Sequence, residues 1–200
     1  MNRIILASQS PRRAQILEWA EIPFEVLVKH GDEDYPPEMK VEDIPEFLAV
    51  KKGQVVLESL THKAENFPGY LHPIPVVAAD TVVILDGEII GKPKNRQEAV
   101  DSLIRLSGNT HKVVTGVAIL YKGKTIRFSE TTYVHFHPLT EQQIGYYVDK
   151  YQPYDKAGGY AIQEWIGVVG INKIEGDFYN VMGLPVSKLL QYLREILPEI

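Results

Sequence analysis

The stretch Pro75–Pro93, PVVAADTVVILDGEIIGKP, decides the fold class because it combines a strand pattern with a tight turn. Val82–Leu85 and Glu88–Ile90 consist mainly of residues that favour strands. The Asp86-Gly87 pair between them is typical of a type I′ turn, which needs two consecutive residues with positive φ. The stretch therefore predicts an antiparallel hairpin.

The segments on both sides of this hairpin alternate between strand and helix patterns. A second hairpin of long strands is predicted at 111–137, with its turn at 122–124. Further strands are predicted at 3–7, 24–28, 158–163 and within 168–176, helices at 11–20, 44–60, 96–106, 141–150 and 187–197, and loops at 29–40 and 61–74. This mixture of hairpins and intervening helices predicts an α/β or α+β fold with a mixed sheet.

The composition limits the classes of protein that the chain can belong to. Its 200 residues suffice for one domain, or for one domain with two lobes. A net charge of −5 argues against broad binding to nucleic acid or to membrane surfaces, which usually needs a basic face. No run approaches the roughly 20 apolar residues that span a bilayer. The absence of cysteine and of a signal-peptide pattern fits a cytoplasmic protein.

The sequence SQSPRR at 8–13 places two cations at a predicted helix start. Pro11 suits the first helical position, with Ser10 as its N-cap. A helix N-terminus carries a partial positive charge, so Arg12 and Arg13 oppose the helix dipole. The arrangement becomes favourable if an anion such as a phosphate chain binds there. The alternative is that both arginines are surface residues paired with acids elsewhere.

Three other positions are candidates for chemistry. Asp80 interrupts an otherwise apolar strand, and it fits a turn residue, a buried hydrogen-bond acceptor, a metal ligand or a proton acceptor. Lys92, between a glycine and a proline, fits either a phosphate contact or a solvated turn. Gln163 follows an apolar segment and fits either a reader of a base edge or a loop anchor. Asp155 and Lys156 are expected to pair with each other.

Seven segments, in order, resemble the landmarks of the Maf family of nucleotide pyrophosphatases, also called septum-formation inhibitors. They are LASQSPRR, LAVKKG, AADTVV, GKP, SGNTHKVVTGVAI, DKAGGYAIQ and GDFYNVMGLPV. The resemblance implies one Maf-like domain over 1–200, with a fold related to inosine triphosphate pyrophosphatases. That fold has an elongated mixed sheet with flanking helices and two lobes around a cleft. It also implies a homodimer.

The resemblance implies cleavage of a nucleoside triphosphate between its α and β phosphates, with Mg²⁺ or Mn²⁺. Asp80 matches the catalytic proton acceptor, and Glu33 matches the acidic residue at the metal and the water, so both are the implied metal site. The residues that match the phosphate-binding set are Ser8, Ser10, Arg12, Arg13, Lys52 and Lys92. Those that resemble the branch acting on dTTP and UTP are Thr81, Gln163 and one of the arginines, Arg12 or Arg13.

Two departures from the family pattern leave alternatives open. Gly53 stands where the family usually has alanine, so the phosphate lysine is Lys52 or Lys51. In the acidic loop GDED, Asp32 and Asp34 are rivals to Glu33.

Two alternative functions also fit the sequence. One is a non-enzymatic nucleotide sensor that acts on cell division, and the other is a pyrophosphatase for inosine or xanthosine triphosphate. An isolated carboxylate such as Asp80 favours an enzyme, because a pure binder of polyphosphate has little use for one.

Overall fold

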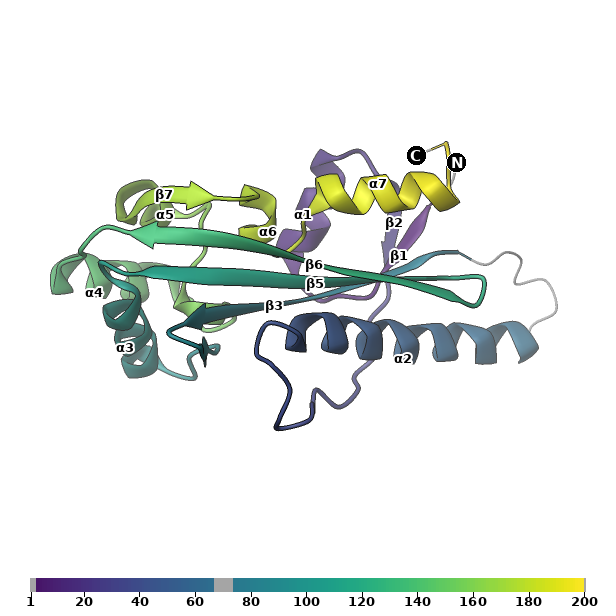
Figure 1. Cartoon of the computed structure of the whole chain (residues 1–200), viewed down its shortest axis with the longest axis horizontal. Helices are drawn as coiled ribbons and strands as arrows, with labels where there is room; N and C mark the ends of the chain where they lie inside the picture. The colour runs from purple at the N-terminus through teal and green to yellow at the C-terminus, as the bar shows by residue number, and fades with distance from the viewer. Residues whose placement is uncertain (1–2, 67–73, 200) are drawn as a thin grey trace. The chain divides into compact units, whose positions relative to one another are not determined.

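The computed structural model describes residues 3–66 and 74–199. The chain divides into two compact units, each assembled from separate pieces of sequence (Figure 1). The first unit comprises Met1–Asp80, Thr115–Ser129 and Gly183–Ile200. The second unit comprises Thr81–Val114 and Glu130–Met182.

A seven-stranded sheet has the strand order β2-β1-β3-β5-β6-β7, with β4 paired to β3. The strands are β1 (Ile4–Leu6), β2 (Phe24–Val26), β3 (Val76–Leu85), β4 (Glu88–Ile90), β5 (Thr110–Tyr121), β6 (Lys124–Phe136) and β7 (Ile171–Glu175). The short strand β1 is parallel to both β2 and β3, whereas β3 is antiparallel to β4, and β6 to β7. The predicted mixed sheet with flanking helices is therefore confirmed.

Both predicted hairpin turns are confirmed by their backbone angles. Asp86 and Gly87 have φ values of 51° and 82°, and Lys122 and Gly123 have values of 49° and 75°. Two consecutive positive φ angles are what a type I′ turn requires, and its twist matches that of the flanking strands.

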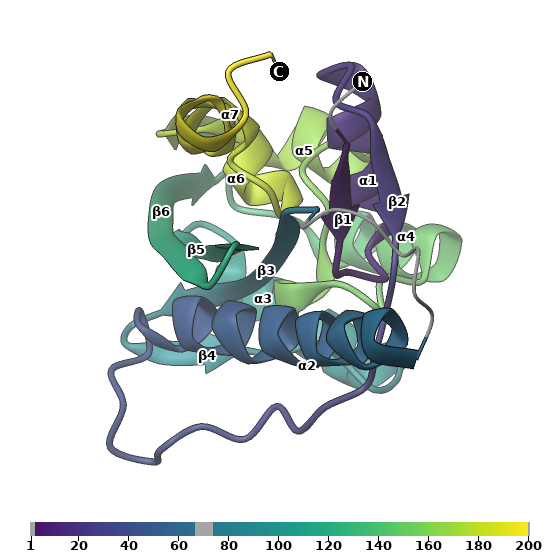
Figure 2. The same cartoon turned by 90° about the vertical axis from the view of Figure 1, so that its right-hand side faces the viewer.

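In the first unit, helices cover both faces of the sheet. The helices are α1 (Pro11–Trp19), α2 (Ile44–Asn66) and α7 (Val186–Ile196), and α2 and α7 lie on opposite faces of the β5–β6 hairpin (Figure 2). The core beneath α2 consists of small and branched apolar side chains from four elements, namely Ile5, Ala7, Ala49, Val56, Val76, Ala78, Ala118 and Leu120. Burial of this apolar surface fixes the helix on the sheet, whose strand β3 carries Asp80.

The long helix α2 extends beyond its predicted end. It ends at Asn66 rather than near Leu60, so the predicted loop at 61–74 is wrong for residues 61–66. Residues 61–66 contain no glycine or proline that would end a helix. The predicted end was based only on the lack of a regular apolar pattern there, which does not prevent a helix from continuing. The rest of that predicted loop, 67–73, lies outside the described residues.

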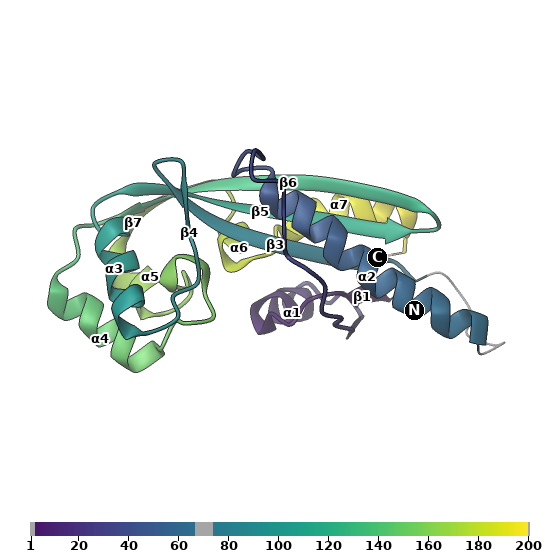
Figure 3. The same cartoon turned by 90° about the horizontal axis from the view of Figure 1, so that it is seen from below.

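The second unit contains α3 (Arg96–Leu106), α4 (Glu141–Tyr151), the 3₁₀ helix η1 (Ala157–Gly159), α5 (Trp165–Gly170) and α6 (Phe178–Met182). Helix α3 packs beside α4 (Figure 3). At the starts of α3 and α4, the Asn95 side chain accepts from the Glu98 N–H, and Thr140 and Gln143 form a capping box. Across the described residues of both units, no helix is long and apolar enough to span a membrane.

The strand predicted at 158–163 is wrong. Gly158 and Gly159 have φ values of 71° and 70°, which a strand does not adopt, and they belong to η1. The second predicted strand is confirmed only at 171–175, because residues 165–170 form helix α5. Helices α5 and α6, with six and five residues, are too short to show a helical repeat of apolar residues in the sequence.

His111 is expected to make the fold less stable in mild acid. It is 1% exposed, with its Nε2 2.7 Å from the Tyr160 hydroxyl, and burial lowers its pKa to about 3, helped by the nearby His135. The unfolded state takes up a proton below pH 6.5 that the folded state refuses until about pH 3, so stability falls as pH drops through this window. We expect a loss of up to about 1.4 kcal/mol per pH unit from this group.

Urea unfolding at pH 7.5, 6.0 and 5.0 tests this expectation. The His111→Gln variant, which lacks the titrating ring, should show a smaller pH dependence than the wild type. An equal dependence in both proteins would assign the acid sensitivity to other groups.

Candidate functional site

The corner between β1 and α1 is organised by a serine hydroxyl. Ser8 is buried, and its Oγ accepts from the Ser10 N–H at 3.2 Å and from Arg13 Nη1 at 2.9 Å. Ser10 occupies the predicted N-cap position, but its side chain makes no capping hydrogen bond. Pro11 is the first helical residue, as predicted. Ser8 therefore holds the backbone just before the helix, while the Ser10 hydroxyl takes no part in capping it.

The two arginines of this corner have different surroundings. Arg13 is only 9% exposed, and its Nε donates to the Gly183 carbonyl at 2.7 Å. Burial lowers the pKa of Arg13 to about 10, partly offset by the charges of Asp80 and Glu33, so the guanidinium stays protonated at neutral pH. Arg12 is half-buried. Arg13 therefore has a structural contact to a distant part of the chain, which the sequence did not reveal.

We expect Arg13→Ala to lower the free energy of unfolding by about 1–3 kcal/mol. The substitution removes two hydrogen bonds and leaves the Gly183 carbonyl without the Nε donor. Arg12→Ala, in the same helical turn, is the matched control and should have a smaller effect. Urea denaturation of the two variants makes the comparison. Equal losses of unfolding free energy in the two variants would show that the Arg13 hydrogen bonds contribute no extra stability.

Asp80 and Glu33 converge on the same lysine ammonium. Lys52 Nζ lies 2.6 Å from Asp80 Oδ1 and 2.8 Å from Glu33 Oε1. Asp80 lies in the middle of β3, Lys52 lies on α2, and Glu33 belongs to the segment between β2 and α2. The Asp80 side chain is 16% exposed and that of Glu33 is 65% exposed. A half-buried carboxylate thus lies next to a more accessible one, with a cation between them.

The two lysines that the sequence left as alternatives have different partners. Lys51 points to a different partner, because its Nζ donates to the backbone oxygen of Asp34 at 2.9 Å. Lys52 is thus the lysine that contacts Asp80. Gly53 also has a packing reason, since a Cβ there would lie 2.3 Å from Leu120 Cδ1. Gly53 therefore faces the core that α2 forms with β3 and β5.

The other predicted site residues belong to the second unit. Thr81 is half-buried on β3, directly after Asp80. Lys92 is exposed just beyond β4, where the Gly158 N–H donates to the Gly91 carbonyl at 3.1 Å. Gln163 is exposed on a turn rather than at the end of a strand. The predicted pair of Asp155 and Lys156 is confirmed, with 2.7 Å between Oδ1 and Nζ.

Sequence reasoning missed two polar residues beside Gln163. Tyr147 is fully buried on α4, and its hydroxyl donates to the carboxylate of Glu164. The available signal in the sequence was Glu164, directly after Gln163, because a carboxylate beside a candidate site needs a hydrogen-bond partner.

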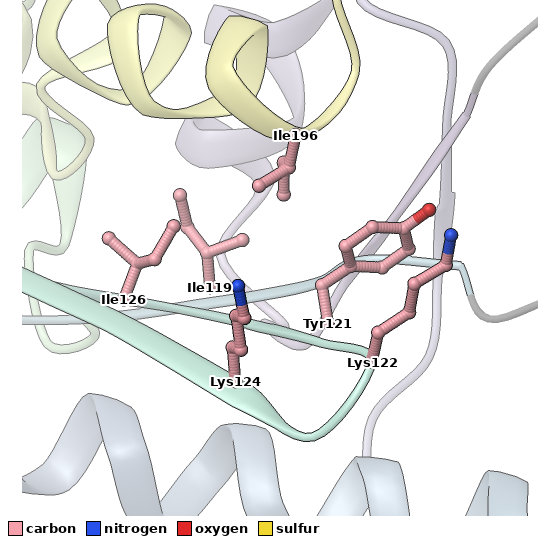
Figure 4. A pocket seen from close by; sticks show the side chains of 6 residues that line it. All are labelled: Ile119, Tyr121, Lys122, Lys124, Ile126 and Ile196. Atoms are coloured by element: carbon pink, nitrogen blue, oxygen red, sulfur yellow. The ribbon is translucent and has the colours of Figure 1, made fainter.

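A hollow of about 140 Å³ lies in the first unit, between α7 and the tip of the β5–β6 hairpin (Figure 4). Its lining is mainly apolar and consists of Ile119, Tyr121, Lys122, Lys124, Ile126 and Ile196. None of the site residues predicted from the sequence lines this hollow, so it is not part of the candidate site.

The mixed α/β sheet carries, where β3 faces α2, two carboxylates around one lysine ammonium, and carboxylates of this kind can accept a proton or contact a cation. The chain belongs to the Maf family, since the family model described as Maf-like protein matches residues 3–196.

Relatives from several bacteria are similar to the chain over nearly its whole length. A protein of Cytophaga hutchinsonii named dTTP/UTP pyrophosphatase is 48% identical, over 96% of this chain and 84% of its own. Proteins of the same name are 45% identical in Porphyromonas gingivalis, over 96% and 94%, and 44% identical in Bacillus thuringiensis subsp. konkukian, over 98% and 96%. The structure of the Staphylococcus aureus Ham1 protein matches with a TM-score of 0.46 and 15% identity, over 68% of this chain and 72% of that one.

Proposed function

We propose that the protein hydrolyses dTTP and UTP to the nucleoside monophosphate and pyrophosphate. The observation that carries the proposal is the convergence of Asp80 and Glu33 on Lys52, within 2.6 and 2.8 Å. The relatives named dTTP/UTP pyrophosphatase support the substrate class. Family membership over residues 3–196 supports an activity of the kind that these relatives are named for.

In this proposal Asp80 accepts a proton from the attacking water. The water oxygen forms a bond to the α-phosphorus, and the bond from that phosphorus to the α–β bridging oxygen breaks. Pyrophosphate leaves with the bonding electron pair, and the water proton passes to the Asp80 carboxylate. Because Asp80 is only 16% exposed and held by Lys52, its carboxylate has a fixed direction before substrate binds.

The carboxylates suit a divalent cation. Asp80 Oδ1 and Glu33 Oε1 contact one ammonium, so they already converge on a position suitable for positive charge. Within the described ranges, no group of three or more His, Cys, Asp or Glu side chains could hold a metal alone. Mg²⁺ and Mn²⁺ are commonly bound through one or two carboxylates together with substrate phosphates, so this donor set fits them. Bound there, such a cation supplies charge neutralisation for the phosphate oxygens.

Phosphate binding needs positive charge that the net charge of −5 conceals. We assign it to Ser8, Ser10, Arg12, Arg13, Lys52 and Lys92. The start of α1 adds backbone N–H groups and the positive end of the helix dipole, with no acidic residue in its first turn. Because Arg13 is buried and bound to Gly183, Arg12 is the more accessible guanidinium of the pair.

Base selectivity is assigned to Gln163, with Thr81 and one arginine of α1. The glutamine amide offers both a donor and an acceptor, which suits the N3–H and the carbonyls of uracil and thymine. Cytosine lacks the N3–H and carries an amino group in place of one carbonyl, so the same amide meets a mismatched edge. A polar group left unpaired costs about 1–3 kcal/mol, or roughly 5- to 150-fold in kcat/KM.

We therefore expect Gln163→Ala to lower the ratio of kcat/KM for UTP to that for CTP. This fall should be larger than the fall in kcat/KM for the best substrate. The measurement is kcat/KM for dTTP, UTP, CTP and GTP on both proteins. A variant that slows all four nucleotides equally would remove Gln163 from base reading. A wild type that prefers GTP or inosine triphosphate would favour the purine-specific alternative.

The proposed function as a whole is tested by a substrate screen. Purified protein is incubated with eight ribo- and deoxyribonucleoside triphosphates, with Mg²⁺, with Mn²⁺ and with EDTA. We expect dTTP and UTP to be consumed fastest, and only with a metal. Binding of nucleotide without turnover under every condition would favour a sensor. We also propose a homodimer, which the resemblance implies, and a cytoplasmic location, which fits the absence of cysteine and of a signal-peptide pattern. Light scattering in solution tests the first of these.

A further inference from the structure

One buried hydroxyl group holds both ends of the turn that carries Gln163. The Glu164 N–H donates to the Ala161 carbonyl at 3.1 Å, which closes a four-residue turn with Gln163 at its third position. The hydroxyl of Tyr147 accepts from the Ala161 N–H at 3.1 Å and donates to the Glu164 carboxylate. The first and last residues of the turn are therefore fixed to the same oxygen atom.

The Glu164 side chain is committed to this contact. Glu164 is the N-cap residue of α5, yet its side chain makes no capping hydrogen bond. Its second carboxylate oxygen lies 3.7 Å from the ammonium of Lys156, which is itself only 9% exposed. Instead of capping the helix, the Glu164 carboxylate is directed at Tyr147 and Lys156.

The turn is also pressed against α5 through its backbone. A Cβ at Gly167 would lie 1.7 Å from the carbonyl oxygen of Ile162, so this approach is open only to glycine. The Gly167 N–H also donates to the Glu164 carbonyl at 2.9 Å. Contacts from both α4 and α5 thus fix the backbone on either side of Gln163, whose side chain is exposed.

We propose that Tyr147 is a positioning residue that sets the base selectivity of the enzyme by holding the Gln163 turn. The inference rests on the proposed function, in which Gln163 reads the base. Hydrogen-bond discrimination between uracil and cytosine depends on an amide that cannot shift to suit either edge. Without the Tyr147 hydroxyl, the turn keeps its sequence but loses the contacts that restrict its position.

Tyr147→Phe tests the proposal, because it removes one oxygen and keeps the ring that stacks on Tyr151 at 5.0 Å. We expect the ratio of kcat/KM for UTP to that for CTP to fall by roughly 5-fold or more, a loss comparable to that of one hydrogen bond. The kcat for UTP should stay within about 2-fold of the wild type, since selectivity is lost without loss of the chemical step. An unchanged ratio in Tyr147→Phe would overturn the proposal.

Tyr160→Phe is the matched control. It removes another buried phenol oxygen of the same unit, whose partner is His111 at 2.7 Å rather than the turn. The nucleotide ratio, that is, kcat/KM for UTP divided by kcat/KM for CTP, should stay at the wild-type value in this variant. An equal fall in both tyrosine variants would indicate general loosening and would overturn the proposal.

A double-mutant cycle shows whether Tyr147 acts through Gln163. In a Gln163→Ala background, Tyr147→Phe should change the nucleotide ratio no further, and a full additional effect would contradict the proposal. If Gln163→Ala alone leaves the ratio unchanged, base reading by Gln163 fails, and the inference fails with it. If Gln163→Ala lowers the ratio but Tyr147→Phe does not, only the inference fails.

A second pair of variants serves if Tyr147→Phe does not fold. Glu164→Ala removes the acceptor of the Tyr147 hydroxyl and should lower the nucleotide ratio. Glu164→Gln keeps an oxygen acceptor at that position and should retain most of the ratio. The same ratio in both Glu164 variants would overturn the role of this contact.

Discussion

Replacement of Asp80 by asparagine is expected to lower kcat by roughly 10²–10⁴-fold, the range that general-base catalysis contributes. Asparagine has nearly the shape of aspartate, and its carbonyl oxygen can still accept from Lys52, which lies 2.6 Å from Oδ1. The substitution therefore keeps the cluster while it removes the proton acceptor and one negative charge. Nucleotide binding, measured by titration calorimetry, should persist.

Glu33→Gln is the matched control for this experiment. Glu33 contacts the same ammonium at 2.8 Å, but its side chain is 65% exposed, against 16% for Asp80. If the carboxylate that accepts the proton is the more enclosed one, Glu33→Gln loses less activity than Asp80→Asn. Near-normal turnover in Asp80→Asn would transfer the proton-acceptor role to Glu33 or another group.

Gly116→Ala is expected to lower the free energy of unfolding by more than about 3 kcal/mol, beyond the usual cost of overpacking. Gly116 lies on β5, and a Cβ there would be 2.1 Å from the Glu46 nitrogen and 2.2 Å from the Pro45 carbonyl carbon. Both atoms belong to the backbone of the first turn of α2, so no side chain can rotate away. The helix that carries Lys52 would have to move.

The control for Gly116→Ala is Gly145→Ala, which should raise the free energy of unfolding rather than lower it. Gly145 lies within α4, and a Cβ there would meet only Arg96 Nη2, at an ordinary contact distance of 3.8 Å. Alanine is favoured over glycine in a helix by about 1 kcal/mol, so this variant should be more stable than the wild type. Urea midpoints for both variants make the comparison. A Gly116→Ala protein as stable as the wild type would refute the close approach of β5 and α2.

The elements that could be predicted are those specified by neighbouring residues. The turns at 86–87 and 122–123 and the caps at Asn95 and Thr140 depend on residues within four positions of one another. Helices α5 and α6 were missed because they are short, whereas the turn at 161–164 was missed because it depends on a residue outside it. The turn at 161–164 is fixed by Tyr147, and no local pattern separates such a turn from a short strand.

The same distinction applies to the candidate site. The sequence placed Asp80, Glu33 and a lysine in one site through family resemblance, but it left Lys51 and Lys52 as alternatives. Successive residues of a helix point in directions about 100° apart, so the choice depends on how α2 is rotated against β3. The contact of Arg13 with Gly183 was also out of reach, because 170 positions separate them.

Analysis of the first products shows whether hydrolysis occurs between the α and β phosphates. Purified protein is incubated with dTTP and Mg²⁺, and the products of the first tenth of the reaction are separated by anion exchange and quantified. We predict thymidine monophosphate and pyrophosphate in equal amounts, with no thymidine diphosphate. Thymidine diphosphate and orthophosphate as the first products would place cleavage at the γ phosphate and contradict the account.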